Sequence, residues 1–173
     1  FRRTTKTSLF SAAVYRRNGR DMIDYAIDSA GKAKAENITN VDVNGVDVSF
    51  TARLDAGWLQ QLRIGLLYQD VRSSAPSKTR YVADNLRSQG VFETRWNFPL
   101  DIHGTYIARL VERVTDPTMH LVHDVRLWRA FGPITLTAEA TNLSNERFVE
   151  TGWVTIPPRW ARVGVEFRAA NSE

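Results

Sequence analysis

The sequence predicts an all-β fold, an antiparallel up-and-down meander of about eight long strands. Three observations support this fold class. Helical periodicity is nearly absent, whereas apolar and polar residues alternate with a period of two in segment after segment. The polar set of alternating residues is heavily charged, and the connections between segments are alternately short and long. A chain with these features is expected to form one sheet whose two faces and two ends differ in chemistry.

The first four strands are each bounded by residues that favour turns. Their expected ranges are about Ser8–Ile27, Asn40–Leu54, Gln60–Arg72 and Leu86–Phe98. Each has apolar residues on one parity, which places them on one face of the strand. In chain order these residues are Phe10, Ala12 and Val14, then Val46, Val48, Phe50, Ala52 and Leu54, then Leu62, Ile64, Leu66 and Tyr68, and finally Phe92, Thr94, Trp96 and Phe98.

The last four strands follow the same pattern. Their expected ranges are about Ile102–Val114, His120–Phe131, Ile134–Thr141 and Arg159–Arg168. The seventh is the most regular, with small and medium apolar side chains on one parity and Thr or Glu on the other. In chain order the apolar residues are Ile102, Gly104, Tyr106, Ala108 and Leu110, then Val125, Leu127 and Phe131, then Ile134, Leu136, Ala138 and Ala140, and finally Ala161, Val163, Val165 and Phe167.

The charged parity indicates which face meets water. An arginine at the midplane of a lipid-facing strand costs about 2–4 kcal/mol, whereas in a water-filled interior it costs little. We therefore expect the apolar set to face lipid and the charged set to face the aqueous lumen of a transmembrane β-barrel. Arg129 is an exception on the apolar parity and is expected to snorkel to the membrane interface. The candidate lumen-facing residues are Arg53, Arg63, Glu93, Arg95, His103, Arg109, Arg126, Glu139, Arg162 and Glu166. Arg–Glu pairs across strands are expected among them, such as Glu93 with Arg109 or Glu139 with Arg162.

Connection lengths point to the same architecture, because barrel turns are short on the periplasmic side and loops are long outside. The short connections are Asp55–Leu59, Pro99–Asp101 and Gly132–Pro133. The longer ones are Asp28–Thr39, Ser73–Asn85, Thr115–Met119 and Asn142–Pro158. Aromatic residues gather near the short turns, as an interfacial girdle would require. These aromatic residues are Trp58, Trp96, Phe98, Phe131 and Phe167.

Composition excludes several other classes of protein. The 173 residues carry a net charge of +4, but the basic residues are spread singly along the strands, which disfavours nucleic-acid binding. The absence of cysteine excludes a disulfide framework, a thiolate metal site and a cysteine nucleophile. No apolar run reaches the roughly 18 residues of a membrane helix, a length that barrel strands do not need.

No arrangement of residues predicts covalent chemistry, and we expect neither enzyme activity nor a cofactor. There is no Gly-x-Ser-x-Gly nucleophile turn and no glycine-rich phosphate loop. Asp21 and Asp24, like His120 and His123, are three residues apart, so on a strand the members of each pair point to opposite faces. Neither pair is then placed to share a proton or a metal ion.

The segment TNLSNERFVETGWVTIPPRWARVGVEF, from Thr141 to Phe167, carries a family resemblance. It has an Asn-Leu pair ending a strand, an aromatic residue after a polar run, a Pro-x-Arg sequence and a closing strand that alternates to Phe. The segment YRRNGRDMIDY has the pattern of a strand that leads into a long loop. The segment ENITNVDVNGVDVSF has the pattern of the strand that returns from it. In this order the segments resemble the C-terminal part of TonB-dependent receptors, from about Ser8 to Arg168. Ser144 and Pro158 depart from the family, which usually has a bulky apolar residue and Gly there.

The resemblance implies that residues 1–173 are the C-terminal segment of a receptor barrel of about 22 strands, with the plug domain absent. It implies energy-coupled import of a scarce nutrient, such as a siderophore or cobalamin, across the bacterial cell outer membrane. Implied partners are outer-membrane lipid, the plug and the rest of the barrel, a small-molecule ligand such as a metal chelate, and the TonB complex through the missing N-terminal part. In this family the outer loops gather substrate, which makes Tyr81 and Trp153 candidate ligand contacts.

Two other classes stay open. A complete small eight-stranded outer-membrane barrel with a structural or adhesion role would show the same alternation. A soluble β-sandwich or lipocalin-like binder is disfavoured, because it would have to bury an arginine-rich face.

Overall fold

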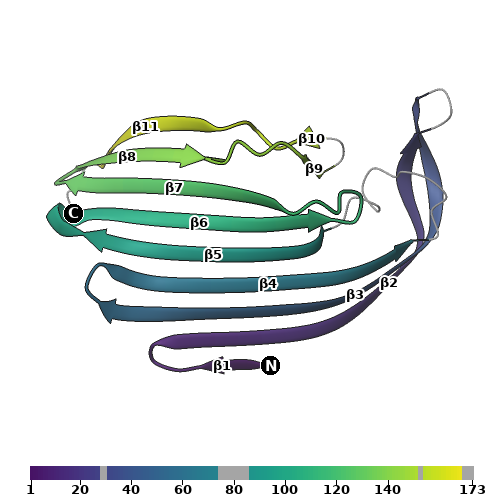
Figure 1. Ribbon diagram of the computed structural model, residues 1–173, viewed down its shortest axis with the longest axis horizontal. Coiled ribbons are helices and arrows are strands. Elements are labelled where there is room, and N and C mark those ends of the chain that lie inside the picture. The colour runs from purple at the N-terminus through teal and green to yellow at the C-terminus, as the bar shows by residue number, and fades with distance from the viewer. Residues whose placement is uncertain (28–30, 74–85, 152–153, 169–173) are drawn as a thin grey trace, which may run out of the picture.

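The structure is a computed structural model that describes residues 1–27, 31–73, 86–151 and 154–168. Figure 1 shows one curved antiparallel layer, and the predicted all-β meander is confirmed. Its nine-stranded sheet has the order β1-β2-β3-β4-β5-β6-β7-β8-β11, and β9 pairs with β10. The strands are β1 (Arg2–Thr4), β2 (Ser8–Ile27), β3 (Ala33–Ala56), β4 (Leu59–Ser73), β5 (Leu86–Phe98), β6 (Ile102–Arg113), β7 (His120–Phe131), β8 (Ile134–Thr141), β9 (Val149–Thr151), β10 (Val154–Thr155) and β11 (Trp160–Phe167).

The eight predicted strands correspond to β2–β8 and β11. One predicted boundary was wrong, since β3 begins at Ala33 rather than near Asn40. The extra residues form a strand because they pair with the outer end of β2, with Ala33 opposite Ile27. Three short strands, β1, β9 and β10, were not predicted, because two or three residues are too few to show alternation.

The registers place all the apolar sets on one face of the sheet, called the apolar face below. Residues directly opposite each other on antiparallel strands point to the same side. Val48 is opposite Ala12 on β2 and Leu66 on β4, and the row continues through Gly90, Leu110 and Leu121. On the last strands, Leu127 is opposite Ala138, which is opposite Val163. The opposite surface is called the charged face.

The two ends of the sheet differ as the connection lengths predicted. The turns Gly57–Trp58, Pro99–Asp101 and Gly132–Pro133 lie together at the left of Figure 1, here called the turn end. Gly57 and Gly132 have φ angles of 59° and 57°, which glycine adopts without a steric cost. The long connections leave from the right of Figure 1, here called the loop end.

The sheet has little core of its own. On the apolar face, large side chains such as Val14, Leu66 and Val163 remain 84%, 59% and 82% exposed. The buried apolar clusters lie toward the loop end and consist of Val41 and Val43 in one case and Val111, Val122, Phe148 and Ile156 in the other. A soluble domain would cover its apolar face with a second layer. Among the described residues no such layer exists, so this face requires apolar surroundings.

The nine-stranded sheet is open. β1 and β11 are its two edges, and no pairing between them is present in the part of the chain that the structure describes. Within the same residues, no helix is long and apolar enough to cross a membrane.

Candidate functional site

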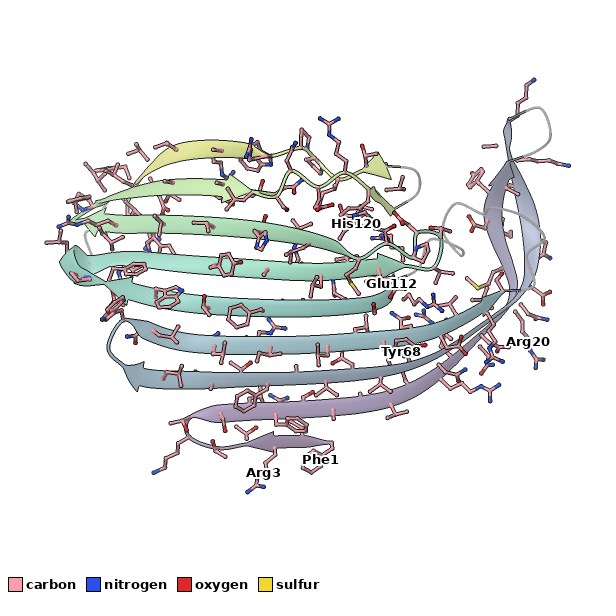
Figure 2. The ribbon with its side chains drawn as sticks, viewed as in Figure 1. Phe1, Arg3, Arg20, Tyr68, Glu112 and His120 are labelled. Atoms are coloured by element: carbon pink, nitrogen blue, oxygen red, sulfur yellow. The ribbon has the colours of Figure 1, made fainter. Side chains whose placement is uncertain are left out.

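The charged face contains all ten residues predicted to line the lumen. The registers align seven side chains from β3 to β11 in a single row across the sheet. That row consists of Arg53, Gln61, Arg95, Thr105, Arg126, Glu139 and Arg162. Four arginines and one carboxylate in one row make this surface cationic. Figure 2 shows the side chains standing on both sides of the sheet.

Ion pairs connect several of these residues, but not all as predicted. Glu93 is 3.1 Å from Arg95 and 3.8 Å from Arg63, which stands directly opposite it on β4. The expected pair between Glu93 and Arg109 is not formed. Arg109 instead lies 2.9 Å from Asp124, because β6 places Ile107, not Arg109, opposite Glu93.

The pair predicted between Glu139 and Arg162 is confirmed, with 2.6 Å between the carboxylate and Nη2. Aromatic rings hold other members of the charged face. The Trp128 ring stacks on His103 with 5.4 Å between ring centroids, and the Arg126 guanidinium carbon lies 5.7 Å from the Trp128 ring centroid. Trp128 thus contacts both His103 and Arg126 on the charged face.

Arg129 lies on the apolar face, as its parity predicted. Its register partner on β8 is Leu136, and its guanidinium carbon is 4.5 Å from the centroid of the Phe131 ring. Phe131 is the last residue of β7 at the turn end. The Arg129 guanidinium therefore lies over the Phe131 ring near the end of the strand, where its charge can reach water.

Asn142, from the Asn-Leu motif, is the hydrogen-bonding centre of the loop end. It is 3% exposed and has a φ angle of 48°, which Asn tolerates better than most residues. Its Nδ2 donates to the carbonyls of Glu146 and Pro157 at 3.0 and 2.9 Å, and its Oδ1 accepts from the Glu146 amide at 2.9 Å. Its own amide donates to Asp124 at 2.9 Å. Asn142 thus ties the long final connection to β7.

The Asn142 connection folds over the charged face. Phe148 and Ile156 pack on Val111 of β6 and Val122 of β7, which belong to that face. Ser144, which departs from the family pattern, donates to the Leu121 carbonyl at 2.6 Å. At this position a hydrogen bond to β7 thus takes the place of the packing that a bulky apolar residue would make.

His120, the first residue of β7, lies between two carboxylates at the loop end (Figure 2). Its Nδ1 is 3.0 Å from Glu146 Oε2, its Nε2 is 2.9 Å from Asp116 Oδ2, and its ring stacks on Phe148 at 4.4 Å between centroids. A neutral imidazole donates only one hydrogen bond, so two carboxylate partners require the protonated ring.

The electrostatics of this cluster agree with its geometry. His120 pairs with Val111, one position beyond the Leu110–Leu121 pair toward the loop end. Burial alone lowers the pKa of His120, but the hydrogen bonds to Asp116 and Glu146 outweigh burial and raise the pKa above its ordinary value. The hydrogen bond to His120 is also the main reason why the pKa of Asp116 is lowered.

His123 points away from His120, as predicted from their spacing. It lies on the apolar face opposite Ala108, and its Nδ1 is 2.6 Å from the Tyr106 hydroxyl. Among the described residues, no group of three or more His, Asp or Glu side chains is placed to hold a metal ion.

The charged face is hollowed where β5 to β8 run side by side. A depression of about 340 Å³ is lined by residues that include Arg95, Thr105, Arg126 and Glu139. Its donors and carboxylates can hold polar or anionic groups, but it contains no pairing of a base with a nucleophile. The two candidate loop contacts, Tyr81 and Trp153, lie outside the described residues.

A single-layer meander with an exposed apolar face, a charged opposite face, and turns and loops at opposite ends has the architecture of a segment of an outer-membrane β-barrel wall. Two solved structures have a similar arrangement of strands. The FrpB iron transporter from Neisseria meningitidis (F3-3 variant) superposes with a TM-score of 0.68 and 13% identity, over 96% of this chain and 30% of its own. The ferric-catecholate import receptor Fiu from E. coli K12 superposes with a TM-score of 0.62 and 16% identity, over 94% of this chain and 25% of its own.

Both neighbours are TonB-dependent receptors, so the resemblance seen in the sequence is confirmed at the level of the fold. They are transporters or receptors rather than enzymes. No protein-family model and no curated protein matches the chain by sequence. The chain spans less than a third of either neighbour.

Proposed function

We propose that the chain is the C-terminal barrel segment of a bacterial outer-membrane receptor that imports a scarce nutrient, such as a siderophore or cobalamin, by energy coupling. The observation that carries this proposal is the superposition of nearly the whole chain, 96%, on 30% of an iron transporter. The two-faced sheet supplies the physical support, because the same register that exposes every apolar set gathers ten polar residues on the other face.

In this role the apolar face contacts outer-membrane lipid and the charged face lines the lumen. The cationic row from Arg53 to Arg162 then faces the plug domain and an anionic ligand such as a metal chelate. The plug, the remaining strands and the segment that contacts the TonB complex belong to the rest of the receptor. Tyr81 and Trp153 remain proposed ligand contacts on the outer loops.

A complete small eight-stranded barrel with a structural or adhesion role is the second candidate. Such a barrel must pair its first and last strands, but β1 and β11 are separate edges in the described sheet. The open sheet therefore favours a segment of a larger barrel.

The first experiment tests membrane insertion. The chain is refolded into detergent micelles, and unheated and boiled samples are compared by gel electrophoresis. We expect a heat-modifiable band and no folded protein without detergent. A chain that is folded and soluble without detergent would exclude both membrane functions.

The second experiment tests the two faces and uses the absence of cysteine in the native chain. Leu136 and Thr137 are neighbours on β8 with opposite orientation. In vesicles, Leu136→Cys should react only with a lipid-soluble maleimide, and Thr137→Cys with a water-soluble one. Equal labelling of both variants by the water-soluble reagent would contradict the barrel orientation.

A further inference from the structure

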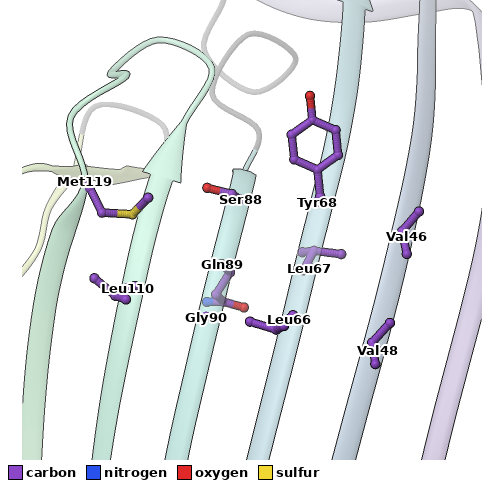
Figure 3. A pocket seen from close by; sticks show the side chains of 10 residues that line it. All are labelled: Val46, Val48, Leu66, Leu67, Tyr68, Ser88, Gln89, Gly90, Leu110 and Met119. Carbon is purple, nitrogen blue, oxygen red and sulfur yellow. The ribbon is translucent and has the colours of Figure 1, made fainter.

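A groove lies across β3 to β6 on the apolar face, near the loop end. Its floor is formed by Gly90 and Ser88, and its volume is about 410 Å³, within the range of pockets that hold small ligands. Figure 3 shows the side chains of Leu66 and Tyr68 on one side of the floor and those of Leu110 and Met119 on the other.

The groove exists because two consecutive apolar-face positions of β5 carry almost no side chain. Gly90 stands opposite both Leu66 and Leu110. A Cβ at Gly90 would lie 3.6 Å from the Leu110 Cβ and 3.8 Å from the nearest Leu66 carbon, which is ordinary contact. A larger residue would therefore fit and fill the floor. One step toward the turn end, Phe92 occupies the equivalent space.

The lining is apolar along the groove and polar only at its outer end. The Ser88 hydroxyl donates to Glu112 at 2.8 Å, and the Glu112 carboxylate is 3.5 Å from Arg87. Leu66, Tyr68 and Met119 remain 59%, 53% and 53% exposed, so the walls present unoccupied apolar surface. A short apolar slot that is bounded by Phe92 at one end and by hydroxyl and charged groups at the other has the polarity profile of the ester-proximal part of one lipid chain below its headgroup.

We propose that this groove holds the ester-proximal part of a single acyl chain of an outer-leaflet lipid, with the ester end at Ser88 and Tyr68. The occupant is lipid rather than protein because the groove is part of the apolar face and opens along it. The inference rests on the proposed function, which places that face in the membrane. An acyl chain seated in the groove contacts three walls, whereas on the flat part of the face it contacts one.

The test uses the full 173-residue chain refolded in micelles. Dipalmitoylphosphatidylethanolamine is added, excess lipid is removed by detergent exchange, and the retained lipid is counted by native mass spectrometry. We expect one retained lipid per chain and at least a fivefold loss of occupancy in Gly90→Leu. Replacing glycine in a strand interior does not weaken the strand, so this variant should fold.

Ala138→Leu is the matched control, because it adds the same side chain to the apolar face of β8 away from the groove, and its occupancy should not change. Leu110→Trp fills the groove from its wall and should repeat the loss. Equal lipid retention by wild-type and Gly90→Leu chains that both show the heat-modifiable band would overturn the acyl-chain site alone. Absence of that band in the wild-type chain would instead overturn the proposed function.

Discussion

Single residues at the loop end determine how the final connection is held. Asn142 makes hydrogen bonds that bring together Glu146, Pro157 and Asp124, although these residues are far apart in sequence. Its left-handed backbone conformation and near-complete burial explain why an Asn stands directly after β8. Asn142 of the Asn-Leu motif therefore has a structural role, since its hydrogen bonds connect the final connection to β7.

Replacing Asn142 should release this connection from the barrel wall. Asn142→Ala leaves buried carbonyl and amide groups without partners and should cost about 2 kcal/mol or more. We expect trypsin to cleave after the exposed Arg147 at least tenfold faster, since cleavage follows the open population. Asn97→Ala, at an exposed site on β5, is the control. An unchanged cleavage rate in Asn142→Ala would show that the hydrogen bonds of Asn142 do not hold the connection in place.

His120 should make the same connection sensitive to pH. Because the pKa of His120 is raised in the folded state, the protonated ring stabilises the cluster fully below about pH 6.5. This stabilisation is lost as the pH rises through the higher pKa of the folded state. The lowered pKa of Asp116 has the opposite sign and weakens the cluster only as the pH falls through that lowered pKa.

Hydrogen exchange of the amides near Phe148 measures this effect. After correction for intrinsic rates, protection should be greater at pH 6 than at pH 9 in the wild type. In His120→Gln the difference should disappear, because a neutral side chain replaces the titrating ring. A pH difference that persists in the variant would assign the effect to another group.

At the scale of the strand, β8 shows how one element serves two environments. Ala138 points to the apolar face and Thr137 to the charged face, where Thr137 stands between Trp128 and Gly164. An arginine at each position therefore tests the environments directly. Ala138→Arg should destabilise the refolded chain by about 2–4 kcal/mol and Thr137→Arg by about 1 kcal/mol or less. The midpoint of urea unfolding in lipid vesicles measures both values, and equal costs would refute a lipid-facing apolar face.

Pairing within the charged face also depends on the strand register. Parity alone placed Glu93 and Arg109 on the same face, but the register between β5 and β6 decided that they do not meet. Side chains on neighbouring strands form a pair only when the register brings them opposite or diagonal. The predicted pair between Glu139 and Arg162 forms because the register of β8 and β11 places them directly opposite each other.

At the scale of the whole molecule, the unpaired edges of the sheet govern its behaviour in solution. Free strand edges template further pairing. We expect the isolated chain in micelles to associate through β1 and β11 into dimers or larger species, measured by light scattering. A stable monomer with the edges of β1 and β11 joined, shown by a disulfide between cysteines placed on them, would favour the small barrel.

The sequence alone determined the eight long strands, the two faces and the two ends, because a period of two and the lengths of connections are local properties. The Asn-Leu motif also drew attention to Asn142. Only the tertiary structure decided the ion-pair partners, the protonated cluster at His120, the groove over Gly90 and the open edges. These features require the registers between strands and the folding of a long connection over the wall, which join residues distant in sequence and leave no local pattern.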